Sequence, residues 1–408
     1  MDSRKFDVVL MGATSFVGQI TARELALHAK QHQPGLRWAM AGRSLSKLQA
    51  VKQDIERRMG ASLEVELITA ESLDDHSMSA LSKAARVVIS TVGPYDLYGE
   101  KLVKQCALNG THYCDLTGEA NFCADMIARY NSVAVKSGAC IVHCCGFDSI
   151  PSDIGVYYLQ QQSKSKFGHP CVRVDMRVAR IKGSFSGGTY ASIVNMVKKT
   201  RRDPELRKQL LNPYLLATES EQVRQPYVAK ATEDSVTGKW VAPFVMAAIN
   251  TKVVLRSAEQ LAYPHRFLYN EAVLTGAGKA GKKRAKIMAL GLNATMVGAA
   301  LAPTRWVMEK FLLPKPGEGP SEQEQVDGHY EIHHHGETTD GNKITVKFSG
   351  DRDPGYGSTA RMLTQAAMAL AFDLAEEQRG GFYTPASLLG DSLLQRLPAH
   401  AGITICTL

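Results

Sequence analysis

The sequence lacks the marks of several protein classes. Its eight cysteines form no C-x-x-C pair, and most lie in apolar stretches, at positions 106, 114, 123, 140, 144, 145, 171 and 406. This pattern predicts free, buried thiols in a reducing compartment, with neither disulfides nor a zinc site. No signal peptide is predicted, because residues 1–5 lead straight into a strand-like run. No apolar run reaches the roughly 20 residues of a membrane-spanning helix.

The chain is basic, but it lacks the sequence pattern of a nucleic-acid-binding protein. The net charge is +8, but no arginine-rich helix and no basic stripe interleaved with aromatics occurs. An anionic membrane surface or an anionic small molecule remains as a partner. With 408 residues, of which 44% are hydrophobic and 22% charged, the chain is long enough for two or three packed domains.

The first third of the chain alternates between strand-like and helix-like segments. Six buried runs read as strands, at 6–11, 38–41, 63–68, 86–91, 111–116 and 140–145, and helical patterns separate them. Ser46 is the expected N-cap of the second helix. Strands alternating with helices predict a doubly wound parallel sheet of the Rossmann type with right-handed crossovers.

The regular alternation of strands and helices ends after Gly146. Strands are expected at 172–182, 240–245, 271–274, 328–335 and 343–349, together with helices at 153–162, 196–225 and an amphipathic one at 358–377. Long excursions between strands predict a mixed α+β domain with an antiparallel sheet. The sequence therefore divides into a nucleotide-binding domain, 1–150, and a substrate or dimerisation domain, 151–408.

A glycine motif follows the first strand and opens the first helix. Gly12 permits a tight turn, and Gly18 lets the helix pack close to the sheet. Ser15 stands where many such loops carry another glycine, but its backbone N–H can still face a pyrophosphate at the helix N-terminus. An ordinary β–α turn is the alternative. The predicted phosphate-binding loop is Gly12, Ala13, Thr14, Ser15, Phe16, Val17 and Gly18.

A basic turn closes the second strand. Arg43 lies there with Ser44 and Lys47, and no Asp or Glu occurs between Arg37 and Lys52. A carboxylate at this place binds the ribose 2′-hydroxyl of NAD, whereas an arginine accommodates the 2′-phosphate of NADP. The turn predicts NADP(H), and a solvated basic turn is the alternative.

Loops at the carboxyl ends of three further strands are expected at the ligand-binding edge of the sheet. The first contributes Thr91, Val92, Gly93 and Pro94 to the cofactor site, and Tyr95 and Tyr98 as candidate catalytic side chains, with aromatic packing as the alternative. The other two bring Asp115, Glu119, Asp148 and Ser149 to the same rim, either as acid–base groups or as helix caps and loop hydrogen-bonders.

Three other features are less decisive. The segment 184–189 (SFSGGT) reads either as an anion or substrate loop or as a hairpin turn. Consecutive histidines at 333–335 point to opposite faces of a strand, so no metal site is predicted there or elsewhere. Five basic residues within 279–286 precede an apolar segment, 287–302, which is either a core or homodimer helix or a peripheral membrane contact spanning 279–303.

These segments together resemble the saccharopine dehydrogenase-like oxidoreductases, in particular their trans-acting enoyl reductase branch. The matching motifs are GATSFVG, AGRSLSKL, TVGPYDLYG, GTHYCDLTGE, CGFDSIPSDIG, SGGTYAS, LPKPGEGPS, DPGYGSTARM and TPASLLGDSLLQRL. They spread in order over almost the whole chain. Ser15 is the departure, because the common pattern has glycine at that position.

The resemblance implies a Rossmann domain, a saccharopine-reductase-like α+β domain whose last helix packs back on the first domain, and NADP(H). It implies reduction of an α,β-unsaturated acyl or polyketide chain carried by a synthase in lipid biosynthesis, with a proton from Tyr95, Tyr98 or water. The first alternative is a saccharopine- or opine-type amino-acid dehydrogenase, which needs basic residues such as Arg180, Lys182 or Arg361 for its carboxylates. The second alternative is a nucleotide-bound scaffold on lipid. The expected location is cytoplasmic. Peripheral membrane or lipid-droplet association of this chain is the alternative, because animal relatives in the family have such an association.

Overall fold

A computed structural model describes the chain except for residues 1–3, 184–193, 195, 198, 218 and 301–318. The predicted loop at 184–189 and most of the LPKPGEGPS motif at 313–321 lie outside the described residues. The chain folds into two compact units. Unit 1 comprises 1–147 and 356–401, and unit 2 comprises 148–355 and 402–408. A segment near the C-terminus therefore completes the unit that the N-terminus begins.

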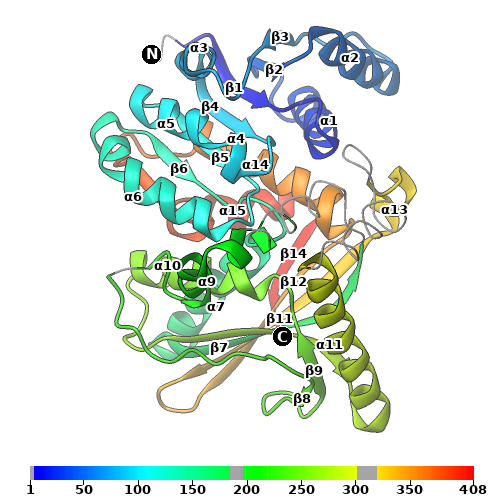
Figure 1. Ribbon diagram of the computed structural model, residues 1–408, viewed down its shortest axis with the longest axis vertical. Coiled ribbons are helices and arrows are strands. Elements are labelled where there is room, and N and C mark those ends of the chain that lie inside the picture. Colours follow the sequence, from blue (N-terminus) through cyan, green and yellow to red (C-terminus); the bar gives the residue numbers. More distant parts are fainter. Residues whose placement is uncertain (1–3, 184–193, 195, 198, 218, 301–318) are drawn as a thin grey trace. The chain divides into compact units, whose positions relative to one another are not determined.

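Unit 1 contains a seven-stranded parallel sheet of order β13-β6-β5-β4-β1-β2-β3, which confirms the doubly wound parallel sheet (Figure 1). The seventh strand was not predicted. It is only three residues long and pairs with β6 through Gly381 and Cys140. The strands are β1 (Phe6–Met11), β2 (Trp38–Gly42), β3 (Glu66–Thr69), β4 (Ala85–Ser90), β5 (His112–Asp115), β6 (Cys140–Val142) and β13 (Gly381–Tyr383).

Helices cover both faces of this sheet (Figure 1). One group comprises α3, α5 and α6, and the other comprises α1, α14 and α15, with α14 lying directly on β1, β4 and β5. The helices are α1 (Phe16–Gln31), α2 (Leu45–Met59), α3 (Asp75–Ala84), α4 (Tyr95–Tyr98), α5 (Glu100–Asn109), α6 (Ala120–Ser137), α14 (Thr359–Phe372) and α15 (Pro385–His400). Buried strand and helix residues between these layers form the core.

Two expectations for these helices were wrong in detail. The N-cap of α2 is Ser44, whose hydroxyl accepts the backbone N–H of Lys47 at 3.4 Å, and Ser46 lies inside the helix. Helix α14 ends at Phe372, and nearly all its side chains are buried. It is therefore a central helix that is buried on nearly every side, because both the sheet and neighbouring helices cover it.

Unit 2 contains a second seven-stranded sheet, of order β14-β12-β11-β7-β10-β9-β8. Most pairs are antiparallel as expected, but β7 and β10 run parallel, so the sheet is mixed. In β11 the side chain of His334 is buried, whereas those of His333 and His335 are partly exposed. The strands are β7 (Cys171–Lys182), β8 (Thr232–Glu233), β9 (Trp240–Pro243), β10 (Leu268–Gly276), β11 (His329–Thr338), β12 (Lys343–Gly350) and β14 (Ile403–Thr407).

One helix of unit 2 is shorter than predicted. Residues 212–217 and 219–225 form turns and irregular chain, so the expected helix over 196–225 is wrong in its second half, where Asn212 ends α9. The helices are α7 (Ile150–Phe167), α9 (Pro204–Leu211), α10 (Ala247–Gln260), α11 (Gly278–Ala300) and α13 (Glu322–Asp327), and a π-helical turn, η2, follows at Pro354–Ser358. Among the described residues no helix combines the length and apolar character needed to cross a membrane. All eight cysteines are free, and all but Cys406 are buried, which confirms their expected packing role.

Candidate functional site

The order of strands in unit 1 creates one switch point. Strands β1 and β4 are neighbours in the sheet but not in the sequence, and the connections leaving them run in opposite directions. Ligands of open α/β sheets bind outside the carboxyl ends of the strands at such a point. The loop after β1 begins at Gly12, and the loop after β4 begins at Thr91. The two predicted cofactor loops therefore lie side by side at this switch point.

The loop from Gly12 to Gly18 is held in a tight, closed geometry. Gly12 has a φ of 90°, which side-chain-bearing residues rarely adopt. The Ser15 N–H donates to the Gly12 carbonyl at 2.9 Å, and the Ser15 hydroxyl accepts the Gly18 N–H at 3.0 Å. A Cβ placed on Gly18 would lie 2.1 Å from the Gly12 oxygen. Only glycine permits this approach of α1 to the end of β1.

The start of α1 forms a cradle for an anion. Ser15 is the N-cap of α1, so the N–H groups of the first turn at Phe16 and Val17 have no acceptor inside the helix. The helix dipole places partial positive charge at the same end. This is the geometry that binds the pyrophosphate of a dinucleotide. The glycines keep the space free of side-chain atoms, so the residues present fit such a cofactor.

The basic turn after β2 adjoins this cradle. A Cβ on Gly42 would lie 3.6 Å from the Thr14 hydroxyl, which shows how closely the two loops approach. Arg43 and Lys47 are exposed, and Ser44 caps α2. The guanidinium of Arg43 is therefore available to a phosphate on the adenosine ribose, where it can form two charge-assisted hydrogen bonds.

The two candidate catalytic tyrosines differ in their surroundings. Tyr95 is 4% exposed and donates its hydroxyl to the Ser90 carbonyl at 2.9 Å. Burial, with the nearby Asp115 carboxylate, raises the pKa of Tyr95 well above its ordinary value. Tyr98 lies at the end of α4 and is 37% exposed. Tyr95 thus anchors the loop that follows β4, whereas Tyr98 is open to a ligand.

Two acidic residues at this edge hold the loops together. The buried Asp115 carboxylate accepts the Thr117 N–H and the Cys144 N–H, each at 3.1 Å, and contacts the His143 ring at 2.7 Å. Glu119 accepts the backbone N–H groups of Tyr95 and Asp96 at 3.0 and 3.1 Å. These contacts match the alternative in which both residues are loop hydrogen-bonders. They also fix the loop that carries Tyr98.

The other two predicted rim residues, Asp148 and Ser149, belong to unit 2. The Ser149 hydroxyl donates to the Asn250 side-chain oxygen at 3.1 Å, and the Asn250 amide donates to Glu271 at 3.1 Å. Tyr269 also donates to Glu271, at 2.7 Å. Burial is the main cause that raises the pKa of Glu271 to about 7. This buried chain of polar side chains was not predicted, because its members are far apart in the sequence.

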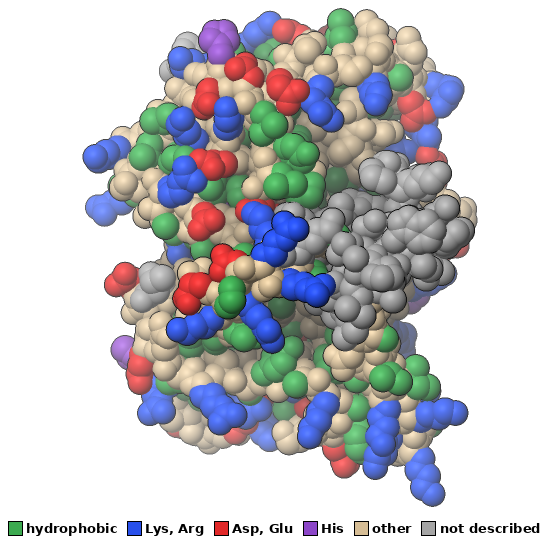
Figure 2. Space-filling view, in the orientation of Figure 1, with side chains coloured by type: hydrophobic (Ala, Val, Ile, Leu, Met, Phe, Trp, Pro, Cys, Tyr) green, Lys and Arg blue, Asp and Glu red, His purple; other side chains and the backbone are tan. Residues whose placement is uncertain are grey.

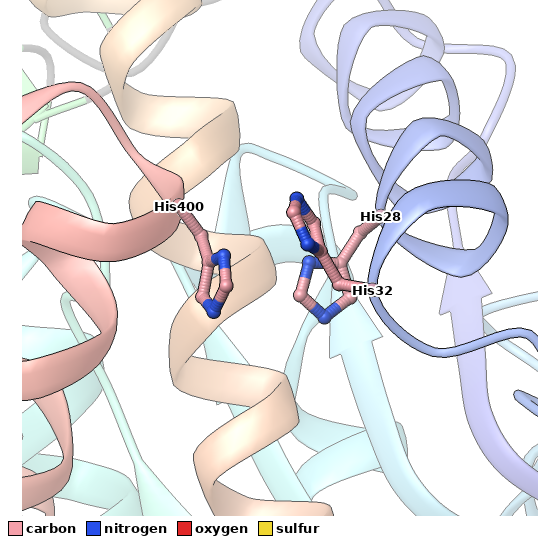
Figure 3. A group of neighbouring side chains, drawn as sticks. All are labelled: His28, His32 and His400. Atoms are coloured by element: carbon pink, nitrogen blue, oxygen red, sulfur yellow. The ribbon is translucent and has the colours of Figure 1, made fainter.

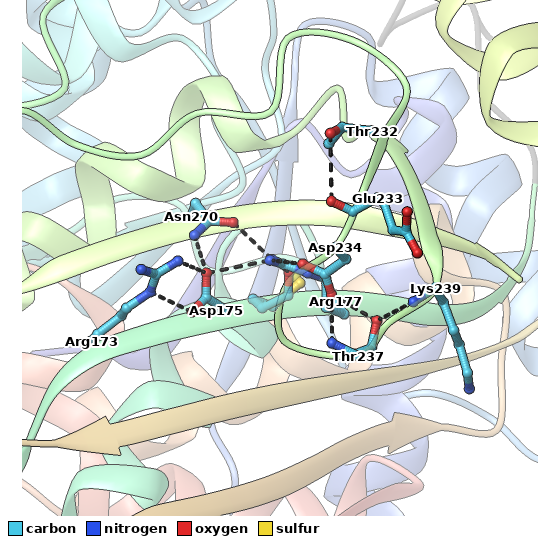
Figure 4. A network of polar contacts seen from close by, with 10 residues as sticks. Arg173, Asp175, Arg177, Thr232, Glu233, Asp234, Thr237, Lys239 and Asn270 are labelled. Carbon is cyan, nitrogen blue, oxygen red and sulfur yellow. Dashed lines mark hydrogen bonds and ion pairs between the residues drawn. The ribbon is translucent and has the colours of Figure 1, made fainter. Parts of the chain in front are cut away.

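A second buried polar network lies between β7, β10 and the β8–β9 turn (Figure 4). The Arg177 guanidinium contacts Asp175 at 3.3 Å and Asp234 at 2.7 Å, and it donates to Asn270 at 2.8 Å. Arg173 binds the other side of Asp175 at 2.7 Å. The buried charges are therefore compensated within unit 2. Charged residues alternating with apolar ones along β7 were the signal in the sequence.

The basic residues considered for binding substrate carboxylates are dispersed. Arg180 and Lys182 are exposed at the end of β7 in unit 2. Arg361 belongs to unit 1 and forms an ion pair with Glu24 at 3.4 Å. Arg361 is thus already neutralised by a carboxylate of the protein itself.

Helix α11 exposes both charged and apolar side chains. Its basic residues, Lys279, Lys282, Lys283, Arg284 and Lys286, are all exposed, and Lys and Arg side chains gather over this helix in the space-filling view (Figure 2). The next turns expose Ile287 by 60% and Leu290 by 71%, whereas Ala285 and Ala289 are buried. Of the predicted segment 279–303, residues 301–303 lie outside the described chain.

Comparison with known proteins identifies the cofactor. Residues 8–142 match the family described as the saccharopine dehydrogenase NADP binding domain. This match covers most of β1 and all of β2 to β6, and it includes the cradle after β1, the basic turn after β2 and the loop after β4. The cofactor is therefore NADP(H), as the sequence predicts.

Relatives extend the similarity over the whole chain. A putative trans-acting enoyl reductase of Mycobacterium tuberculosis is 37% identical over 99% of this chain and 98% of its own length. A trans-acting enoyl reductase of Mycobacterium leprae is 34% identical over 100% of this chain and 98% of its own. Saccharopine dehydrogenase (L-Glu forming) from Saccharomyces cerevisiae shares the fold, with a TM-score of 0.56 at 12% identity, covering 99% of this chain and 100% of its own.

Proposed function

Because the chain belongs to the family of trans-acting enoyl reductases, we propose that it reduces the carbon–carbon double bond of an α,β-unsaturated acyl or polyketide thioester. It is an NADP-dependent oxidoreductase. When bound, NADPH supplies a hydride for the β-carbon of the substrate, and the α-carbon takes up a proton. The conjugated carbonyl spreads the developing negative charge, so the reaction depends more on orientation than on a strong acid.

The observation that carries this proposal is the pairing of the cradle at Gly12–Gly18 with the basic turn at Arg43. The cradle lies at the switch point between β1 and β4, and the turn adjoins it at the carboxyl end of β2. In this proposal a dinucleotide with its pyrophosphate in the cradle and its 2′-phosphate at Arg43 extends its nicotinamide end along the loop that begins at Thr91, where the double bond of the substrate would meet it.

The proton comes from Tyr98 or from water in this proposal. Tyr95 remains a weaker candidate, because its hydroxyl already donates to the Ser90 carbonyl and its raised pKa opposes proton release. The Tyr98 side chain is 37% exposed at the end of α4 and is therefore accessible from solvent. Glu119 supports the arrangement by binding the backbone of the same loop.

The direct experiment follows NADPH oxidation with 2-enoyl thioesters of several chain lengths, offered on coenzyme A and on an acyl carrier domain. We expect saturated product, with deuterium on the β-carbon when the hydride position of NADPH is deuterated. A matched reaction with saccharopine and NADP+ tests the amino-acid dehydrogenase alternative. No turnover at any chain length on either carrier, with NADPH binding intact, would reject the reductase proposal in favour of a nucleotide-bound scaffold.

We also propose that the natural substrate is a chain bound to a synthase. In addition, we propose that α11 contacts an anionic lipid surface. The lipid contact is inferred from the basic residues in 279–286, which lie next to the exposed Ile287 and Leu290. Flotation with liposomes containing anionic lipid tests this, using a variant with Lys282, Lys283 and Lys286 changed to Glu. Loss of flotation is expected. Equal flotation of both proteins would contradict the membrane contact, and a concentration-dependent dimer in light scattering would assign the apolar residues to a second copy.

A further inference from the structure

Three histidines from opposite ends of the sequence meet in unit 1. His28 lies in the last turn of α1, His32 is the C-cap of the same helix, and His400 is the last residue of α15. Their rings point toward one another across a small space (Figure 3). The ring centroids of His32 and His400 are 4.5 Å apart, and those of His28 and His400 are 5.2 Å apart.

The spacing of these rings suits a metal ion. One nitrogen from each ring can be chosen so that all three lie within 4.8 Å of one another. Zinc–nitrogen bonds of about 2.0–2.1 Å in a tetrahedral site require nitrogens roughly 3.3 Å apart. Because the His32 side chain is exposed, ring rotation can close this difference. His28 and His32 also stand four residues apart on one helix face, the spacing by which helical histidine pairs bind zinc.

One of the rings lacks a bonding partner in the part of the chain that the structure describes. The Nδ1 atom of His400 is buried and has no hydrogen-bond partner among the described residues. A metal ion would supply the missing partner.

A glutamine supports the most buried of the three rings. The Gln365 amide lies 3.3 Å from Nδ1 of His28, and its side-chain oxygen is buried without a hydrogen-bond partner in the described part of the chain. Oxygen and nitrogen of an amide are assigned from their partners, so the two can be exchanged. With the oxygen toward His28, it accepts the Nδ1 proton and leaves Nε2 free for a metal. Metal-bound histidines commonly have such a partner.

The electrostatic surroundings also accept a cation. Both α1 and α15 end at this cluster, and the C-terminal end of a helix carries partial negative charge. Arg396 on α15 is a cation that acts on His28, and its guanidinium nitrogen lies 2.6 Å from an Asp373 carboxylate oxygen. That ion pair reduces the repulsion that Arg396 would exert on a metal ion.

We propose that His28, His32 and His400 form a binding site for one divalent transition-metal ion, with zinc as the ion that fits it. Three imidazoles supply three ligands, and the exposed side of His32 leaves a fourth position for water. Imidazole ligands suit zinc and its neighbours, whereas calcium and magnesium prefer oxygen.

The ion would act as a structural cross-link. His28 stands about 18 Å along the helix axis from Phe16, where α1 meets the cofactor cradle. The site is thus too distant to touch a bound cofactor. It would tie the far end of α1 to α15, so binding should raise the thermal stability of unit 1 without changing the affinity for NADPH.

The test measures Zn2+ binding to the untagged full-length protein by calorimetry, together with the melting temperature. A His333→Ala background removes a second imidazole pair, because the rings of His333 and His335 lie 6.0 Å apart. We expect one Zn2+ per chain, a raised melting temperature, and no such effect of Mg2+. His32→Ala and His400→Ala should each abolish tight binding and the thermal shift. His76→Ala, an exposed histidine on α3, should retain both.

A finer variant tests the supporting residue. Replacing Gln365 with Leu removes the partner of His28, and we expect Zn2+ affinity to fall by about 10–100-fold while stoichiometry remains one. His32 and His400 are not fully buried, so their variants should fold, which circular dichroism checks. Absence of stoichiometric Zn2+ binding by the parent protein would overturn the proposal. Retention of tight binding in both the His32→Ala and His400→Ala proteins would do the same.

Discussion

The hydroxyl oxygens of Ser15 and Thr91 lie 3.2 Å apart, within hydrogen-bond distance, and thus join the loop after β1 to the end of β4. Thr91 also donates to the Gly12 carbonyl at 3.0 Å. A glycine in place of Ser15 would lack both this bond and the cap on the Gly18 N–H. The serine that departs from the common pattern therefore stabilises the cradle instead of obstructing it.

Gly18→Ala should damage the cradle. Its new Cβ would lie 2.1 Å from the Gly12 carbonyl oxygen, a backbone atom that can move only with the loop. We expect a loss of about 1–3 kcal/mol in unfolding free energy and weaker NADPH binding, measured by denaturation and by fluorescence titration. Gly35→Ala is the control, because a Cβ there meets nothing within 4 Å. Normal NADPH binding by Gly18→Ala would argue against the cradle as the phosphate site.

Arg43→Asp should change the cofactor preference. The substitution removes the partner of the 2′-phosphate and introduces a carboxylate that suits a free ribose hydroxyl. A lost charge-assisted bond of about 1.5–3 kcal/mol corresponds to roughly 10–100-fold weaker NADPH binding. The measurement is the ratio of the dissociation constants for NADPH and NADH. Arg57→Asp makes the same charge change further along α2 and should leave that ratio unaltered.

Substitution of the two tyrosines should distinguish a role in stability from a role in catalysis. Tyr95→Phe removes the donor to the buried Ser90 carbonyl, so we expect destabilisation by about 1–3 kcal/mol. Tyr98→Phe should leave the melting temperature unchanged but lower kcat for enoyl reduction, with little effect on KM for NADPH. An unchanged kcat in Tyr98→Phe would assign the proton to water. An unchanged stability in Tyr95→Phe would contradict its anchoring role.

Glu271 should make the stability of the protein depend on pH. Its pKa is about 7 in the folded chain against 4.5 for the free side chain. Between these values the unfolded chain holds fewer protons at this site, so stability should fall as pH rises from 4.5 to 7, by about 3 kcal/mol in total.

Glu271→Gln, which mimics the protonated carboxyl, should flatten this part of the stability profile in urea denaturation. Exposed Glu337→Gln provides the control and should keep the slope of the parent protein. Parallel profiles for Glu271→Gln and the parent would show that another group titrates in this range.

The periodicity of the chain predicted most of unit 1. Buried apolar runs such as Phe6–Met11 are long enough to identify strands, and the Gly12–Gly18 spacing identified the turn that follows. The strand at Gly381–Tyr383 escaped prediction because three residues show no alternation. The π-helical turn before α14 and the burial of α14 on all sides arise only from tertiary packing.

The site was predictable where contacts are local. Arg43 and the glycines act within a few residues of one another, so their spacing carries the information. The roles of Asp115 and Glu119 remained open, because caps and acid–base groups use the same residue type. His28 and His400 are brought together only by the fold, and no local pattern in the sequence predicts their contact.

The return of residues 356–401 to unit 1 has a consequence for synthesis. When residue 147 has left the ribosome, the nascent sheet still lacks its edge strand β13 and the helix α14 that fills one face. Apolar surface of β1, β4 and β5 therefore stays uncovered while more than two hundred further residues are translated. The cofactor unit begins first but is completed only after most of unit 2 has been translated, so the nascent chain is expected to need chaperones during that interval.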